Sequence, residues 1–168
     1  MVTVRSEMQS DIPAIRAVQL ATFPTRAEAD LVDALRATEQ LSVSLIAERD
    51  REILGHVAFS PITLNGQDSK GIALGPMAVS PAFQRQSVGT ALLRAGLQTC
   101  TTGGFGFMVV LGHPAYYERF GFVRGSRFGF ENEYGVDEAF MVRELAPDGL
   151  PASGGLVQYA GAFSTLTA

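Results

Sequence analysis

The stretch that decides the fold is Leu74–Leu93, LGPMAVSPAFQRQSVGTALL. It predicts a strand, a tight polar loop, and a helix that Ser87 caps. Loop residues Gln84–Gly89 lie where the first N–H groups of that helix point outward, and such free donors attract anions. Arg85 adds a positive charge, and Gly89 leaves the backbone open to a bulky group. The stretch predicts a cradle for a phosphate or pyrophosphate, although an ordinary capped helix after a loop fits these residues equally well.

Hydrophobic periodicity and turn residues predict alternating helices and strands on both sides of this stretch. The predicted strands are Val2–Met8, Ser42–Glu48, Ile53–Leu64, Gly71–Val79, Phe107–Leu111, Phe122–Arg124 and Ala139–Leu145. The predicted helices begin near Pro13 (capped by Asp11), Thr25 (in a capping box with Glu28), Val88 and Pro114. This order predicts an α/β (α+β) fold with helices around one sheet. Residues 1–146 are predicted to form one domain, and the Gly/Pro-rich tail 147–168 to add a strand.

Composition narrows the class of protein. The chain has 168 residues, 46% of them hydrophobic and 18% charged, so it can bury a core and is not disordered. Its 13 basic and 17 acidic side chains give a net charge of −4, which argues against a general nucleic-acid binder. Cys100 is the single cysteine, and no apolar run approaches the roughly 20 residues of a membrane span. We therefore expect a cytoplasmic protein that does not bind a membrane.

The loop resembles a known motif. Gln84 and Gly89, after a strand that ends in Ala-Val-Ser-Pro, are similar to the ends of the acyl-CoA-binding motif Gln-x-x-Gly-x-Gly of the GNAT superfamily of N-acetyltransferases. The resemblance implies a mixed, mostly antiparallel sheet with splayed strands, and acetyl-CoA as cofactor. It implies cofactor binding by Gln84, Arg85, Gln86, Ser87, Val88, Gly89 and Thr90. Ser87 departs from the motif, and its Cβ is expected to loosen the fit.

Pro76 supports the same reading from within the strand. A proline in a strand interior implies a bulge or an unpaired edge. The resemblance implies that the strand splays here and that the backbone of Met77, Ala78 and Val79 pairs with the pantetheine arm. One of these N–H groups would polarise the thioester carbonyl. An ordinary edge-strand proline is the alternative.

A second signature is His113–Phe122, HPAYYERFGF. It is similar to the superfamily ending Ala-x-x-Tyr-Glu-x-x-Gly-Phe, in particular to a branch of small uncharacterised bacterial acetyltransferases. The resemblance implies that Tyr117 is the general acid that protonates the departing thiolate. Tyr116 takes the preceding position beside the cofactor, and His113 caps the helix or contacts pantetheine. The alternative is that both tyrosines only pack the helix onto the sheet.

Candidates for the acceptor side are acidic. Glu131, Glu133 and Asp137 lie in the predicted loop between the last strands, and Glu28 lies in the first pair of helices. The clustering of the loop acids, together with Glu138, favours a cationic or amine-bearing acceptor, whereas solvated surface acids are the alternative. No metal site is predicted, because the two histidines, His56 and His113, have no metal-binding spacing. His56 is interpreted as structural or half-exposed, and Cys100 as a core residue.

The sequence thus predicts an enzyme that transfers an acetyl group from acetyl-CoA to a primary amine by direct attack in a ternary complex. The acceptor would be a small molecule or a peptide, and a homodimer is a superfamily expectation. The competing class is a non-catalytic acyl-CoA sensor, which the serine at position 87 and the lack of an obvious base would favour.

Overall fold

A computed structural model of the chain describes residues 1–166, which form two compact units. Unit 1 comprises residues 1–59 and 75–99 and the segment that begins at Gly161, and unit 2 comprises residues 60–74 and 100–160. The strands are β1 (Thr3–Ser6), β2 (Val43–Arg49), β3 (Glu52–Leu64), β4 (Gln67–Val79), β5 (Phe107–Leu111), β6 (Val123–Arg124), β7 (Phe130–Asn132), β8 (Phe140–Glu144) and β9 (Gly155–Gln158). The helices are α1 (Ile12–Thr22), α2 (Ala27–Ala37), α3 (Val88–Thr102) and α4 (Pro114–Glu118). Short 3₁₀ turns are η1 (Gln9–Asp11), η2 (Pro81–Phe83), η3 (Gly125–Phe128) and η4 (Gly161–Leu166).

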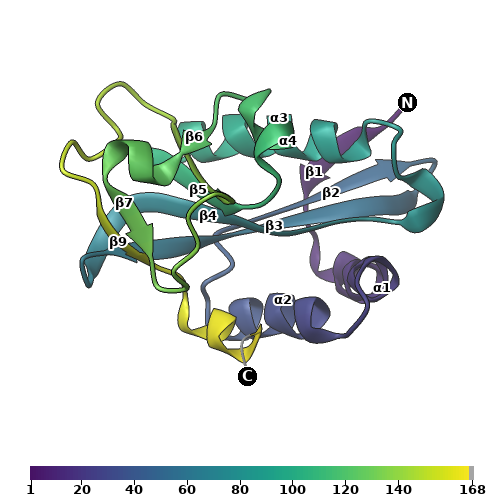
Figure 1. The fold of residues 1–168 in the computed structure, drawn as a ribbon. Helices are drawn as coiled ribbons and strands as arrows, with labels where there is room; N and C mark the ends of the chain where they lie inside the picture. Colours follow the sequence, from purple (N-terminus) through teal and green to yellow (C-terminus); the bar gives the residue numbers. More distant parts are fainter. Residues whose placement is uncertain (167–168) are drawn as a thin grey trace. The chain divides into compact units, whose positions relative to one another are not determined.

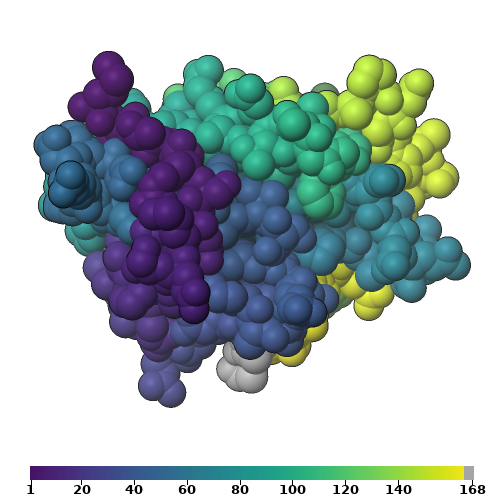
Figure 2. All heavy atoms as spheres, turned by 180° about the vertical axis from the view of Figure 1, so that it is seen from behind, coloured from purple at the N-terminus to yellow at the C-terminus, as the bar shows by residue number. Residues whose placement is uncertain are grey.

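Unit 1 is a layer of antiparallel strands, β1–β2–β3, between helices (Figure 1). Helices α1 and α2 cover one face, where Ile15, Val32, Ile46 and Ala58 form a buried cluster. Helix α3 covers the other face (Figure 1). It can approach closely because Gly96 has no side chain. A Cβ at this position would come within 2.3 Å of the Phe59 ring. In the view from behind, the N-terminal segment, coloured purple, lies at the surface of this unit beside atoms of later residues, coloured blue (Figure 2).

Unit 2 is built around β5. Strand β4 pairs with β5 in parallel, β8 pairs with β5 antiparallel, and β6 pairs with β8 antiparallel. Strand β9, formed by the tail, pairs with the end of β3 and with β7. Antiparallel pairing predominates, as expected for the predicted α/β fold, and both tight hairpins use residues with positive φ at their turns. These residues are Asp50, Arg51, Asn65 and Gly66.

Two predicted helix starts are wrong in detail. Asp11 does not cap α1 with its side chain, because its carboxylate accepts hydrogen bonds from the Met8 N–H (2.7 Å) and the Arg5 guanidinium (2.8 Å). Helix α2 begins two residues after Thr25, whose Oγ1 accepts a hydrogen bond from the Ala27 N–H (3.3 Å). The predicted capping box with Glu28 therefore does not form. Both differences arise because a nearby charged or backbone group competes for the capping side chain.

The part of the chain that the structure describes contains no helix long and apolar enough to span a membrane. Within the same residues, no group of three or more histidine, cysteine, aspartate or glutamate side chains is arranged to hold a metal ion.

Candidate functional site

The loop between β4 and α3, in unit 1, is fastened to the end of β4. The Gln84 side-chain Nε2 donates to the Val79 carbonyl (3.0 Å), and that carbonyl also accepts from Thr22 Oγ1 (3.1 Å). Gln84, the first residue of the motif, thus positions the loop through a hydrogen bond to the strand that precedes it. Val79 presents its carbonyl inside this network, while Met77 is half-buried and Ala78 is buried.

The backbone of the loop takes an unusual conformation just before α3. Arg85 and Ser87 have φ angles of +63° and +68°, in the left-handed region that glycine adopts at little cost. The Ala91 N–H donates the first helical bond, to the Ser87 carbonyl (3.0 Å), so the N–H groups of Val88 and Gly89 precede it. Ser87 is not an ordinary cap, because capping residues have extended backbone. Its backbone takes the shape for which a glycine would be suited.

The surface of this loop is accessible, and its floor is fixed. Gln84, Arg85, Gln86 and Ser87 are exposed, and Thr90 is half-buried. Val88 is buried beneath the loop, where Gly55 of β3 permits close packing: a Cβ on Gly55 would lie 3.1 Å from Val88 and 3.0 Å from the Ala78 carbonyl. The start of a helix above a closely packed floor is an arrangement that can bind an anion. The predicted splay of the strand at Pro76 stays a prediction.

Tyr117, in unit 2, is buried on α4 with its ring held from several sides. The ring makes edge-to-face contacts with Tyr116 (centroids 5.0 Å apart) and Phe122 (5.5 Å). It also lies directly on Gly112 at the end of β5, because a Cβ there would come within 2.4 Å of Tyr117 Cε2. Only glycine leaves room for the tyrosine at this point. The sequence pattern therefore fixes the orientation of this phenol through its neighbours.

The Tyr117 phenol is held in its protonated form. Burial, and secondarily the neighbouring Tyr116, raise its pKa to about 12. A phenol with this pKa keeps its proton throughout the neutral range and can donate it. The Cys100 thiol is also disfavoured as a thiolate, since burial raises its pKa to about 12. Cys100 is a core residue, as predicted, and the pKa of its thiol opposes a role as nucleophile.

The two other predicted residues of this helix differ from each other. Tyr116 is half-buried, and the Arg119 guanidinium lies over its ring, 5.4 Å from the centroid. His113 is exposed at the N-cap position of α4 but makes no side-chain capping hydrogen bond, so its predicted capping role is wrong. Its imidazole is too exposed to be held by the fold, and contact with pantetheine remains a prediction.

The acidic residues predicted for the acceptor side make different contacts in the structure. Glu133 accepts a hydrogen bond from the Tyr159 N–H (2.8 Å) and so fastens the tail, whereas Asp137 pairs with Arg124 (3.6 Å). Glu131 lies in β7, not in a loop, and lines a hollow of about 440 Å³ together with Asp137. In unit 1, Glu28 Oε1 is buried without a hydrogen-bond partner among the described residues. Among the predicted acids, Glu28 therefore has a buried acceptor atom that no described residue satisfies.

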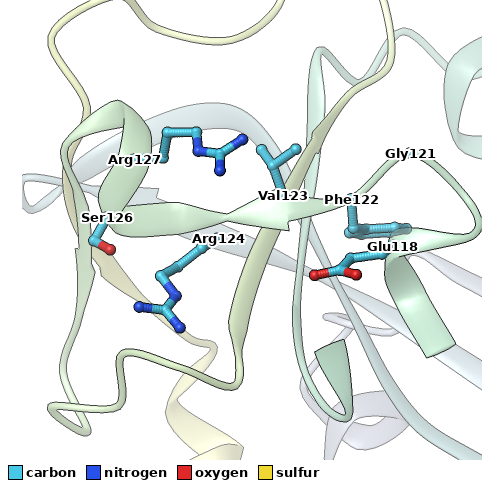
Figure 3. Close-up of a pocket in the computed structure, with 7 residues that line it drawn as sticks. All are labelled: Glu118, Gly121, Phe122, Val123, Arg124, Ser126 and Arg127. Carbon is cyan, nitrogen blue, oxygen red and sulfur yellow. The ribbon is translucent and has the colours of Figure 1, made fainter. Parts of the chain in front are cut away.

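Two other hollows of unit 2 were not foreseen from the sequence. One, of about 800 Å³, is lined by Arg124, Ser126 and Arg127, with the two arginines on opposite sides of β6 in Figure 3. The other, of about 530 Å³, is defined here as the Leu111 hollow, and its lining residues are Leu111, Gly112, His113, Pro114, Val136, Glu138 and Ala139. The Leu111 hollow is the one that includes Gly112, on which the Tyr117 ring lies.

Comparison with known proteins shows the family to which the chain belongs. Residues 12–122 match the pattern of the Acetyltransferase (GNAT) family. The chain belongs to this family. It is 35% identical over 158 residues to the uncharacterized N-acetyltransferase YhbS of Escherichia coli K12, a match that covers 93% of this chain and 95% of YhbS. It is similar to the uncharacterized N-acetyltransferase YjhQ of the same strain, with 36% identity over 118 residues, 68% of this chain and 65% of YjhQ.

Two solved GNAT structures share nearly the whole fold. The E. coli YhbS structure, in complex with CoA, has a TM-score of 0.92 and 34% identity, and the alignment covers 97% of this chain and 92% of that chain. A GNAT acetyltransferase from Brucella melitensis, in complex with acetyl-CoA, has a TM-score of 0.82 and 36% identity, with coverage of 97% and 98%. These comparisons confirm the predicted family and the predicted fold class.

The GNAT pattern includes both predicted motifs and Glu28, but it ends at Phe122 and so does not reach Glu131, Glu133 and Asp137. It also leaves out Glu138, which sequence analysis counted with the acidic cluster, and Val136, which sequence reasoning missed. One signal was present: Val136 is an aliphatic residue in the acid-rich stretch Glu131–Glu138.

Proposed function

We propose that this GNAT chain transfers the acetyl group of acetyl-CoA to a primary amine by direct attack in a ternary complex. The observation that favours catalysis over binding alone is the buried, protonated phenol of Tyr117. A sensor would have no use for a proton donor fixed by Gly112 and Phe122. Crystal structures of relatives with 34% and 36% identity contain CoA and acetyl-CoA, which supports the choice of donor.

In this proposal, the loop of unit 1 binds the donor's phosphates. The N–H groups of Val88 and Gly89, at the start of α3, would donate to the pyrophosphate, and Arg85 adds charge from an exposed side chain. Gln84 positions the loop by its hydrogen bond to Val79. The remaining donor contacts, proposed from the family resemblance, are the backbone of Met77–Val79 and the residues Gln86, Ser87, Thr90, His113 and Tyr116.

The proposed transfer is one displacement. The neutral amine nitrogen attacks the thioester carbonyl, a C–N bond forms, and the C–S bond breaks. Tyr117 donates its phenolic proton to the departing sulfur, and the amine loses a proton to a base or to water. Glu28 is the candidate that we propose to accept that proton, because its buried Oε1 has no hydrogen-bond partner among the described residues. Small amines and peptide amines are both compatible with this scheme. A homodimer stays a prediction, which a measurement of molar mass by light scattering would test.

The test of the function is release of free CoA thiol from acetyl-CoA with a panel of primary amines. We expect release that depends on the presence of an amine and gives the N-acetylated product by mass spectrometry. Thermal stabilisation by acetyl-CoA without any amine-dependent thiol release would instead identify a sensor.

Arg85→Ala is expected to weaken acetyl-CoA binding about threefold to tenfold at low salt, with a smaller effect at high salt, because a contact between exposed charges is screened. Isothermal titration at two ionic strengths measures this. Arg51→Ala is the matched control, since Arg51 is also exposed and has a φ of +68°. The two variants therefore share the cost of placing alanine in a left-handed conformation. Equal loss of affinity at both ionic strengths would argue against a phosphate contact.

A further inference from the structure

The Leu111 hollow has an apolar wall that is open to solvent. Leu111 and Val136 are 38% and 37% exposed, which is unusual for large apolar side chains, and both line this hollow with Pro114 and Ala139. One exposed apolar side chain needs no explanation, but two that face the same concavity form a surface suited to an apolar ligand. Its volume of about 530 Å³ lies within the range of small-molecule sites.

The same hollow adjoins the proposed proton donor. Gly112 is part of its wall, and the Tyr117 ring lies against Gly112, since a Cβ there would be 2.4 Å from Cε2. The Gly112 N–H donates to the Ala139 carbonyl (2.9 Å), which ties the end of β5 to the loop that carries Val136. An apolar group bound here would therefore lie against the same glycine as the ring of the proposed proton donor.

Charge in and around the hollow is suited to an amine. Its lining includes the carboxylate of Glu138 and no lysine or arginine. The neighbouring hollow shares Val136 and contributes Glu131 and also Asp137, whose charge is paired with Arg124 (3.6 Å). An ammonium group is attracted to this surface before it loses its proton, whereas a polycation would gain little from the apolar wall.

We propose that the acceptor is a hydrophobic primary amine, an alkylamine or arylalkylamine whose apolar body occupies the Leu111 hollow. This inference rests on the proposed function and names the substrate class of the same site. The apolar body is recognised by Leu111 and Val136, and Glu138 selects the cationic form of the amine on entry.

The test compares kcat/KM for hexylamine and phenethylamine with kcat/KM for ethanolamine and spermidine. We expect the hydrophobic amines to be preferred by at least tenfold, because a few methylene groups in an apolar pocket give that discrimination. In the double variant L111Q/V136T, kcat/KM for hexylamine is expected to fall at least tenfold. We expect kcat/KM for ethanolamine and the KM for acetyl-CoA to stay unchanged. Leu156→Gln is the control, since Leu156 is 37% exposed outside this hollow.

The outcomes separate the two proposals. Thiol release that prefers ethanolamine or spermidine, or a hexylamine rate that the double variant leaves intact, overturns the hydrophobic acceptor while the acetyltransferase function stands. Absence of release with every amine overturns the function and this inference together. Equal loss with Leu156→Gln would show a general surface effect and also contradict the assignment.

Discussion

Tyr117→Phe is expected to lower kcat by about 10²–10⁴-fold while leaving acetyl-CoA affinity nearly unchanged, the range typical for loss of a general acid. The substitution removes one oxygen and keeps the ring that packs against Gly112 and Phe122, so the fold should be preserved. Without the phenol, the thiolate leaves unprotonated. Rapid-quench measurement of the chemical step, together with isothermal titration of acetyl-CoA, separates this effect from a change in binding.

The pH profile provides a second readout of the same role. Because the pKa of Tyr117 is raised to about 12, its deprotonation should cause no fall in rate below about pH 10. The rate should rise with pH as the acceptor amine loses its proton. Tyr134→Phe is the control, because it removes a buried hydroxyl from another tyrosine of unit 2. A wild-type rate in Tyr117→Phe would exclude the phenol as proton donor and would leave it a packing residue.

The elements that sequence patterns predicted best are those whose signals are local. Helix α3 and strand β5 have the predicted bounds, because Val88 begins an apolar helical period and the Gly103-Gly104 pair ends it. Strand β7 was missed. It has three residues, and its pairing partner β9 lies more than 20 residues further along the chain, so no local pattern reveals it.

Sequence motifs predicted which residues belong to the candidate site, but they did not predict the backbone conformation of those residues. Residue types identified the loop and Tyr117, but nothing local required Arg85 and Ser87 to take left-handed backbone, which most side chains disfavour. The Leu111 hollow was missed for a different reason. Its walls come from β5 and from the loop before β8, and the pairing of Leu111 with Phe140 brings them together only in the folded chain.

The same limit applies to the buried polar chain around His56 in unit 1. His56 is fully buried, not half-exposed, with Gln19 Nε2 at 2.9 Å from Nδ1 and Ser44 Oγ at 2.8 Å from Nε2. An amide nitrogen can only donate, so Nδ1 accepts and the Nε2–H donates to Ser44. The Ser44 hydroxyl donates in turn to Glu7, which pairs with Arg36 (2.9 Å). The bond from Gln19 requires a neutral imidazole, because Nδ1 can accept a hydrogen bond only when it carries no proton.

Acid is therefore expected to destabilise the protein through His56. Burial, in spite of the attraction of Glu7 and with the help of Arg36, lowers its pKa from 6.5 to about 4. The unfolded state binds the proton first, so this stabilisation is complete above pH 6.5 and is lost as the pH falls toward 4. The loss should be about 2 kcal/mol between pH 7.5 and pH 5. Glu7, whose pKa is lowered from 4.5, weakens the fold only at lower pH.

Urea unfolding of the wild type and of His56→Gln at pH 7.5, 6 and 5 measures this effect. The variant keeps a side chain that can donate and accept but cannot titrate, so its free energy of unfolding should vary with pH by about 2 kcal/mol less than that of the wild type. His113→Gln is the matched control, because it removes the other histidine, at an exposed position, and should retain the wild-type slope. Identical slopes in all three proteins would show that the pKa of His56 is the same in the folded and unfolded states. The protonated ring would then have to donate from Nδ1 to Gln19, with the amide oxygen as acceptor.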